Sequence, residues 1–396
     1  MPGIECQLPE PVTYQVWCRR LPSCFIILSR DLFHPSGYGA PAEILHPTRA
    51  ARVGTPRLGR GPRAAPLGTP VSRTPETLFM KALRVEKRGA KITEIEKPEC
   101  GQEALVRVLL SGICKTDLEI AGGYAGFKGT IGHEFVGLIE ESPDGMLAGQ
   151  RVVGEINAGC GKCELCRAGD PRHCPERTVL GILGRDGAHA EFLRLPLVNL
   201  LPVPDKIADE HAVFTEPLAA AYGIMERVSV SSSTRVAVVG DGKLGLLCAQ
   251  SLALTGAPVL LIGKHPEKLR IAERRGIEAV SVKKSANRKR EFDVVVEASG
   301  SASGFAMSVD LLRPRGTLVL KSTFHGTTEI DAARVVVDEI NVVGSRCGRF
   351  APALDLLKKG ALDVDSLISE EYPLSSGVLA LERAGKPGML KVLLRP

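Results

Sequence analysis

Four cysteines lie within the sixteen residues 159–174, "GCGKCELCRAGDPRHC", in the spacing C-x2-C-x2-C-x7-C; they are Cys160, Cys163, Cys166 and Cys174. Stable disulfides are not expected in a chain with no signal-peptide pattern. The ferredoxin run C-x2-C-x2-C-x3-C-P has a shorter last gap, although Pro175 does follow here. Four thiolates on short loops suit a tetrahedral zinc ion with no position open to substrate. The spacing therefore predicts a closed, structural zinc site.

A second group of metal-binding residue types is more widely spaced. "SGICKTDLEI" contains Cys114, and nineteen residues later "GHEFVG" contains His133 and Glu134. Taken singly, such a cysteine is more often a small core residue and such a histidine a structural one. Taken together, a thiolate, an imidazole and a carboxylate are typical of a zinc site that keeps one position open.

A glycine-rich stretch, "VAVVGDGKLGLLCAQ", has the spacing G-x-G-x-x-G directly after an apolar strand and at the start of a helix. In a dinucleotide site the first glycine permits the tight turn and the second lets the backbone approach the pyrophosphate. The third glycine allows the helix to pack closely on the strand, and the helix N-terminus supplies N–H donors. We therefore expect this loop to bind a dinucleotide through Gly240, Gly242, Leu244 and Gly245.

The end of the next strand bears on which dinucleotide is bound. About 20 residues past the loop, an acid normally accepts a hydrogen bond from the ribose 2′-hydroxyl of NAD. This chain has Gly263, Lys264 and His265 there, in "LLIGKHPEKL". A cation at this place favours a 2′-phosphate, so we expect NADP(H); the alternative is that Lys264 projects into solvent.

The elements around these motifs fall into two patterns. Short runs rich in Val, Leu, Ile and Phe, such as "ALVRVLLSGIC" and "EFVGLIEE", predict a β-rich region before Asp205. After it, apolar strands alternate with amphipathic helices, which indicates a parallel sheet covered on both faces. From about Cys347 the pattern predicts a helix, "PALDLLKKG", and a final strand, "LKVLL". The expected fold class is α/β.

Charge and composition set residues 1–79 apart from the rest of the 396-residue chain. They hold nine Arg, no Lys and five acidic residues, and twelve of the 27 prolines. The whole chain carries +6, of which this segment contributes +4. We expect the segment to be largely disordered, with organelle targeting as the alternative. No apolar run is long enough to span a membrane, and little positive charge remains elsewhere to bind nucleic acid, so we expect a cytoplasmic protein with neither partner.

Five motifs in one order carry a resemblance to a known family: "GICKTDLEIAGG", "GHEFVG", the four-cysteine segment, "FTEPLAAA" and "VVGDGKLG". The chain from Met80 to Pro396 resembles the zinc-containing medium-chain dehydrogenase/reductase superfamily, and within it the polyol, glucose and threonine dehydrogenases. The resemblance implies a GroES-like catalytic domain over 80–205, a Rossmann domain over 206–344 and a return to the catalytic domain over 345–396. It also implies two zinc ions per chain and a homodimer or homotetramer.

The resemblance also implies roles for individual residues. Cys114 and His133 are similar to catalytic zinc ligands, and Glu134 to the carboxylate beside them. Glu216, in "TEPLA", stands where polyol and glucose dehydrogenases have a glutamate at or beside the metal. Thr116 and Glu119 are similar to a proton relay. Lys115 and Lys391 stand where related enzymes use a basic residue near the pyrophosphate; the alternative for both is a solvated lysine.

The activity implied is hydride transfer between an alcohol or carbonyl, with a polyol or sugar as one class of substrate, and a nicotinamide cofactor. Two alternatives to this activity remain, and in a third reading the Arg/Pro-rich residues 1–79 are an interaction module that brings the enzyme to a partner. A non-catalytic relative that binds dinucleotide as a redox sensor or structural protein would have a damaged zinc set. A zinc-free reductase of the same superfamily would lack both the four-cysteine segment and the Cys–His pair. The substrate itself is not readable from these motifs.

Overall fold

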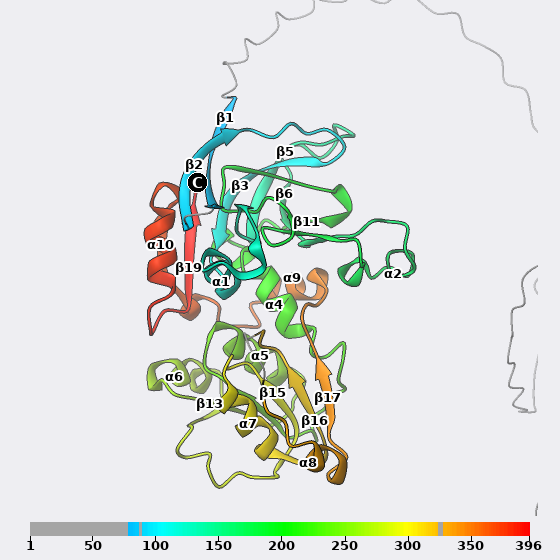
Figure 1. Ribbon diagram of the computed structural model, residues 1–396, viewed down its shortest axis with the longest axis vertical. Coiled ribbons are helices and arrows are strands. Elements are labelled where there is room, and N and C mark those ends of the chain that lie inside the picture. The colour runs from blue at the N-terminus through cyan, green and yellow to red at the C-terminus, as the bar shows by residue number, and fades with distance from the viewer. Residues whose placement is uncertain (1–77, 87–88, 324–327) are drawn as a thin grey trace, which may run out of the picture. The chain divides into compact units, whose positions relative to one another are not determined.

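The computed structural model describes residues 78–86, 89–323 and 328–396 (Figure 1). The expectation of disorder over residues 1–79 therefore concerns a segment that, up to residue 77, lies outside the described ranges. Among the described helices, none has the length and apolar character that crossing a bilayer requires.

The β-rich part is built on a sheet in the order β11-β6-β5-β3-β19-β18, with β10 also paired to β3, and on a smaller sheet in the order β2-β1-β4. The strands are β1 Phe79–Glu86, β2 Gly89–Glu96, β3 Ala104–Gly112, β4 Gly129–Thr130, β5 Glu134–Glu141, β6 Arg151–Gly154, β10 Phe192–Leu195, β11 Leu200–Pro202, β18 Ile368–Pro373 and β19 Lys391–Arg395. A third sheet, β7-β8-β9, comprises Asn157–Ala158, Thr178–Leu180 and Gly184–Arg185.

Burial explains why these segments are strands. In β3 and β5, Val106, Leu110, Val136 and Ile139 are buried in one core cluster. β5 coincides with the run "EFVGLIEE" that the sequence predicts, because its apolar residues pack inward until two exposed glutamates end it. The last strand, β19, joins this sheet from the far end of the chain and pairs antiparallel with β3.

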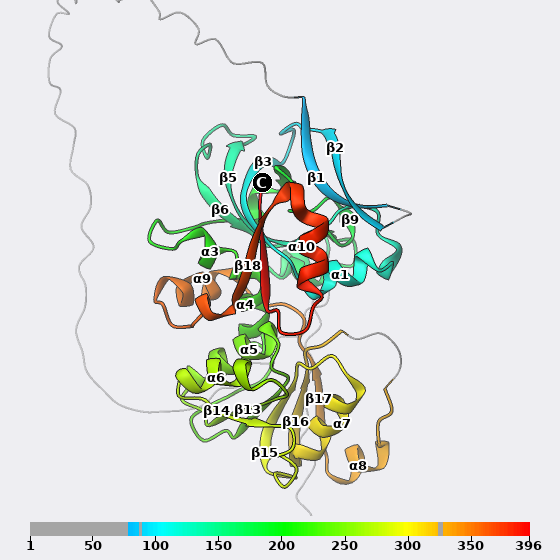
Figure 2. The ribbon, with the colours of Figure 1, turned by 90° about the vertical axis from the view of Figure 1, so that its left-hand side faces the viewer.

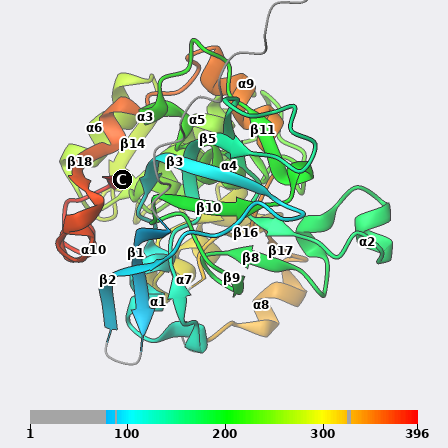
Figure 3. The same ribbon diagram turned by 90° about the horizontal axis from the view of Figure 1, so that it is seen from above.

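Short helices accompany the β-rich part: α1 Lys115–Ala121, α2 Glu164–Arg167, α3 Asp209–Ala212, α9 Phe350–Lys358 and α10 Gly377–Ala384. Helix α4, Thr215–Tyr222, packs against both α9 and α5 and so links the β-rich part to the second sheet. Figures 1 and 3 both show the segment around α2 extending away from the sheets.

The second sheet has six strands in the order β14-β13-β12-β15-β16-β17, all paired in parallel. They are β12 Val236–Val239, β13 Val259–Gly263, β14 Glu278–Ser281, β15 Phe292–Glu297, β16 Leu312–Leu320 and β17 Asn341–Gly344. The helices are α5 Lys243–Ala253, α6 Pro266–Arg274, α7 Ala302–Leu311 and α8 Ala332–Val337. Because the order reverses at β12, right-handed crossovers place α5 and α6 opposite α7 and α8 (Figure 2).

The α/β class and the parallel sheet expected from the sequence are confirmed. Two local expectations need correction. The predicted helical run "FAMSVDLLRPRG" ends at Leu311, and its remainder already belongs to β16, because Pro314 and the positive φ of Arg315 (61°) are incompatible with a continuing helix. The last fifty residues also contain β18 and α10, whose short, half-buried patterns the sequence reading did not separate.

Candidate metal and cofactor site

The pairing of β3 with β5 brings the second group of metal-binding residues together. Gly112 lies opposite Glu134 in the register of these strands, and Cys114 follows Gly112 as the N-cap of α1. The ligand atoms of Cys114, His133 and Glu134 all lie within 4.8 Å of one another, which suits a single zinc ion. Two segments nineteen residues apart therefore form one candidate metal centre, which we call the Cys–His–Glu group.

A fully buried aspartate, Asp117, supports this group from α1. Its carboxylate accepts hydrogen bonds from the backbone N–H of Cys114 (2.8 Å) and of Gly132 (3.0 Å). It also lies 3.4 Å from Nδ1 of His133 and 3.5 Å from Nε2 of a second buried histidine, His189. Burial by itself would raise the pKa of Asp117, but His133 and His189 hold it well below its usual range. The charged carboxylate thus lies within ion-pair distance of the imidazole of His133, whose Nδ1 makes no described hydrogen bond.

Glu134 has one oxygen satisfied and one without a partner. The ammonium of Lys391, from β19, donates to Oε2, and both side chains are fully buried. Oε1 is buried and has no hydrogen-bond partner among the residues that the structure describes, which fits a cation bound beside Cys114 and His133. Gly112 makes this pairing fit, because a Cβ there would lie 2.6 Å from Oε2 of Glu134.

Glu216 lies on α4 near the Cys–His–Glu group but is not part of the set within 4.8 Å. Burial raises the pKa of Glu216 to about 7; the negative charge of Glu134 adds to this rise, while His133 and Lys391 oppose it. A carboxyl group with this pKa can hold or release a proton near neutral pH.

The expected relay residues lie on α1, next to Cys114. Thr116 is partly buried, with Oγ1 4.0 Å from the Cys114 sulfur. Glu119 follows one turn later and forms an ion pair of 3.8 Å with Lys115. The side chain of Lys115 extends to the second sheet. Its Nζ lies beside Gly300, beyond the end of β15, where a Cβ on the glycine would be only 2.8 Å from it. Lys391 was also expected near a pyrophosphate. Its ammonium instead forms an ion pair with Glu134, and a contact between Lys391 and the cofactor stays a prediction.

The four-cysteine segment forms a second candidate metal centre. The sulfurs of Cys160, Cys163, Cys166 and Cys174 all lie within 4.8 Å of one another. Desolvation, and then the neighbouring thiols, raise the pKa of Cys166 to about 12. Thiols this close cannot all ionise without a cation, so the donor set fits zinc with four sulfur ligands.

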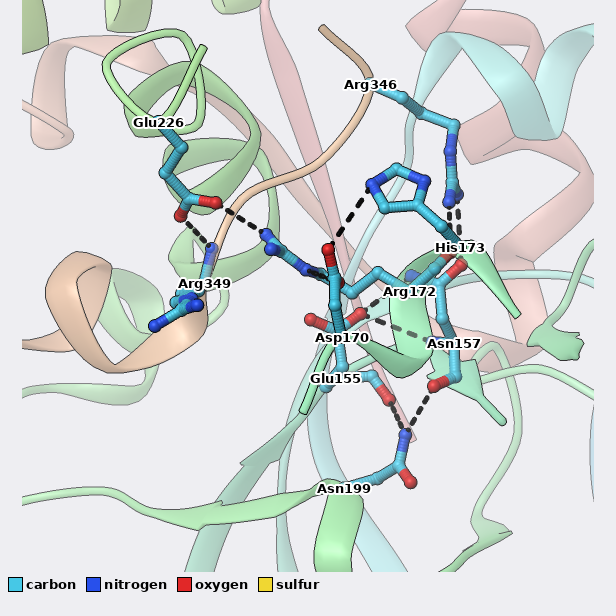
Figure 4. Close-up of polar contacts among 9 residues, drawn as sticks. All are labelled: Glu155, Asn157, Asp170, Arg172, His173, Asn199, Glu226, Arg346 and Arg349. Carbon is cyan, nitrogen blue, oxygen red and sulfur yellow. Dashed lines mark hydrogen bonds and ion pairs between the residues drawn. The ribbon is translucent and has the colours of Figure 1, made fainter. Parts of the chain in front are cut away.

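Polar contacts hold this lobe to the neighbouring elements (Figure 4). Arg172 lies between two carboxylates, at 2.8 Å from Asp170 and 3.0 Å from Glu226. Arg346, at the end of the second sheet, donates to the carbonyl of Arg172 and to Oδ1 of Asn157. The lobe has little apolar surface of its own, and these contacts fix its position instead.

The glycine loop has the geometry that its spacing predicts for a dinucleotide cradle. Gly240 has φ of 122°, which a side chain would strain, and a Cβ there would lie 2.6 Å from the carbonyl oxygen of Ala298. A Cβ on Gly245 would lie 1.9 Å from the carbonyl oxygen of Gly240, so α5 packs directly on the turn. Gly242 faces open space at the N-cap of α5, and Leu244 follows in the first turn. These residues fit a bound pyrophosphate.

The glycine loop also contacts the β-rich part. Nζ of Lys243, the first residue of α5, donates to the carbonyl of Ile113 at 2.6 Å, one residue before Cys114. The dinucleotide cradle and the Cys–His–Glu group are therefore neighbours. Three of these residues, Lys243, Asp117 and His189, were not predicted from the sequence. Lys243 could have been found, because it is a lysine inside the glycine motif. Asp117 and His189 are buried and carry no comparable signal in the sequence.

Lys264 and His265 lie at the end of β13, as expected, but they contact a carboxylate from the glycine loop. The backbone N–H groups of both residues donate to Oδ2 of Asp241, at 2.6 and 2.7 Å. The sequence reading overlooked Asp241, although an acid between the first two glycines of the motif was visible.

Comparison with known proteins adds the family. Residues 101–205 match the family described as "Alcohol dehydrogenase GroES-like domain", and residues 244–359 match "Zinc-binding dehydrogenase". A sorbitol dehydrogenase of Halalkalibacterium halodurans is 29% identical over 80% of this chain and 99% of its own length. An L-threonine 3-dehydrogenase of Rhizobium rhizogenes is 32% identical over 67% of this chain and 83% of its own length.

Solved structures agree with these matches. A zinc-binding dehydrogenase from Sinorhizobium meliloti, bound to NADP, is 31% identical with a TM-score of 0.73 over 80% of this chain and 99% of that one. An Escherichia coli alcohol dehydrogenase complexed with NADH is 27% identical with a TM-score of 0.74 over 81% and 100%. The resemblance seen in the sequence motifs is confirmed, and the chain belongs to the zinc-containing, medium-chain alcohol dehydrogenase superfamily.

Proposed function

We propose that the chain is a zinc-dependent oxidoreductase that transfers a hydride between an alcohol or carbonyl substrate and a nicotinamide cofactor. The observation that carries this proposal is the Cys–His–Glu group, whose ligand atoms lie within 4.8 Å of one another beside the glycine loop. The buried, unpartnered Oε1 of Glu134 supports a cation at this place. An intact ligand set also argues against a non-catalytic, dinucleotide-binding relative.

A bound zinc would supply Lewis-acid polarisation of a hydroxyl or carbonyl oxygen, and a bound nicotinamide would accept or donate hydride. The chain's own residues hold and move the proton. The hydroxyl of Thr116, beside Cys114, would accept the proton of an alcohol while it releases its own proton toward solvent. Glu119, whose side chain is 14% exposed, lies three residues further along α1 and is the carboxylate that we propose as the next acceptor. Glu216 is a further buried carboxyl group near the site; burial favours its protonated form, and a bound zinc ion would favour its charged form.

Polyols and sugars are the substrate class that we propose. Glu119 and Glu216 are the residues that favour it, and the sorbitol dehydrogenase relative supports it. A hydroxy amino acid is the next candidate, because a threonine dehydrogenase is also among the relatives. A screen of primary alcohols, polyols, aldoses and hydroxy amino acids, each with NAD and NADP, tests which class of substrate is turned over.

We also propose that the chain forms a homodimer or homotetramer, which light scattering tests. A cytoplasmic location stays a prediction.

The two zinc sites are tested by metal analysis of purified variants. The wild type should hold two zinc ions per chain, and Cys114→Ser should lose one of them together with activity. Cys163→Ser should lose the other and unfold at a lower temperature, because the four-cysteine lobe has little core of its own. Cys100→Ser is the matched control, since the thiol of Cys100 has one described hydrogen bond, to the carbonyl of Glu103, and lies in neither metal group. A wild type with one zinc ion, or a Cys114→Ser variant with two, would contradict the proposal.

A further inference from the structure

Asp241 belongs to the glycine loop, yet its carboxylate lies at the carboxyl end of β13. Oδ2 accepts hydrogen bonds from the backbone N–H groups of Lys264 (2.6 Å) and His265 (2.7 Å). Nδ1 of His265 lies 3.1 Å from both carboxylate oxygens. Asp241 therefore occupies the N–H groups immediately before α6, a nine-residue helix that begins at Pro266.

Gly263 leaves room for this arrangement. A Cβ built on Gly263 would lie 2.5 Å from both Cβ and Oδ2 of Asp241, and 2.7 Å from its Cγ. The side chain of Asp241 thus fills the volume that a side chain at position 263 would take. In a dinucleotide fold, the end of this strand is where an acid normally meets the adenosine ribose. Here the strand residue is a glycine, and the carboxylate comes from the loop instead.

The carboxylate is charged and keeps an acceptor position available. Burial by itself would raise the pKa of Asp241, but hydrogen bonds from His265 and from the N–H of Lys264 outweigh it and lower the pKa. A carboxylate offers about four lone-pair positions. Two of those on Oδ2 are used by backbone N–H groups, so Oδ1, beside His265, can still accept a hydroxyl.

We infer that Asp241 selects NAD(H) over NADP(H), by accepting the ribose 2′-hydroxyl and by excluding a 2′-phosphate. The phosphate would meet a negative charge and would find the N–H groups before α6 already taken. This inference rests on the proposed dinucleotide binding and reverses the expectation from Lys264 and His265 alone. The side chain of His265 already faces Asp241, whereas the exposed side chain of Lys264 has no described contact.

Equilibrium binding tests the inference without a substrate. The affinities of NADH and NADPH are measured by calorimetry on the zinc-loaded, full-length wild type and on Asp241→Ser. The wild type should bind NADH at least about 10-fold more tightly than NADPH, because the 2′-phosphate would be brought against a carboxylate of the same charge. Asp241→Ser should lose NADH affinity and gain NADPH affinity, since it frees the N–H groups before α6 for a phosphate.

Two further variants make the result specific. Adding Lys264→Ala to Asp241→Ser should remove most of the gain in NADPH affinity, because Lys264 is then the phosphate's nearest cation. Asp331→Ser is the matched control. Asp331 also accepts a hydrogen bond from a backbone N–H, at the start of α8, and its loss should leave the ratio of NADH affinity to NADPH affinity unchanged. If Asp241→Ser does not fold, Asp241→Asn removes the charge at nearly constant volume. It should also lower the ratio of NADH affinity to NADPH affinity.

The outcomes separate this inference from the proposed function. Tighter binding of NADPH by the wild type, or a ratio that stays within twofold in the Asp241 variants, would overturn the inference and leave the dehydrogenase proposal standing. A wild type that binds neither dinucleotide would overturn both.

Discussion

The environment of Asp117 leads to a quantitative prediction for Asp117→Asn. The carboxylate accepts two backbone N–H groups, those of Cys114 and Gly132, and faces His133 and His189 from a fully buried position. An asparagine has the same shape but only one acceptor oxygen. Its NH2 group would therefore face one of these two N–H donors, which would lose its acceptor. It also removes the negative charge that lies 3.4 Å from Nδ1 of His133.

The magnitude follows from these two losses. Groups that orient a metal ligand through its second nitrogen typically contribute 10- to 100-fold in metal affinity, about 1.4–2.7 kcal/mol. A buried N–H that loses its acceptor costs about 1–3 kcal/mol of folding free energy. We therefore expect Asp117→Asn to weaken zinc binding at the Cys–His–Glu group by about 10- to 100-fold. The four-cysteine site should keep its zinc.

A competition titration with a chromophoric chelator measures the affinity, and thermal unfolding measures the stability. Asp186→Asn is the matched control, because Asp186 also accepts a backbone N–H, from Thr130, but has no described contact with the Cys–His–Glu group. Retention of zinc affinity within twofold of the wild type in Asp117→Asn would refute the assignment of Asp117 as a positioning residue.

Two other predictions concern the relay and the pH dependence of stability. Thr116→Val, which keeps the shape but removes the hydroxyl, should lower turnover at least about 100-fold while two zinc ions remain bound, whereas Thr116→Ser should retain activity; a fully active valine variant would remove Thr116 from the relay. Hydrogen bonds from Arg383 and Tyr372 lower the pKa of Glu370 from 4.5 to about 2, so this cluster stabilises the fold above pH 4.5 and loses that contribution as the pH falls toward 2. In denaturant titrations, Glu370→Gln should therefore be less stable than the wild type at pH 7, and the difference should shrink at low pH; an equal difference at pH 7 and pH 3 would contradict this.

Local spacing was enough to identify several features of this protein from its sequence. The four cysteines lie within sixteen residues, so their short loops bring the sulfurs together whatever the rest of the chain does. The glycine loop likewise joins one strand to one helix, and each glycine meets a constraint set by its immediate neighbours. The apolar runs of β3, β5 and β12 predicted strands because buried strands need such residues along their length.

Contacts between residues far apart in the chain required the tertiary structure. Glu134 and Lys391 are 257 residues apart and meet only because β19 joins the sheet beside β3. Asp241 reaches position 263 because β12 and β13 are parallel neighbours whose carboxyl ends meet at one edge. The sequence alone determined which residue types could bind metal and dinucleotide, while packing decided which charges face them. Spacing along the chain constrains only neighbours within a loop or turn, and the pairing of distant strands depends on the whole core.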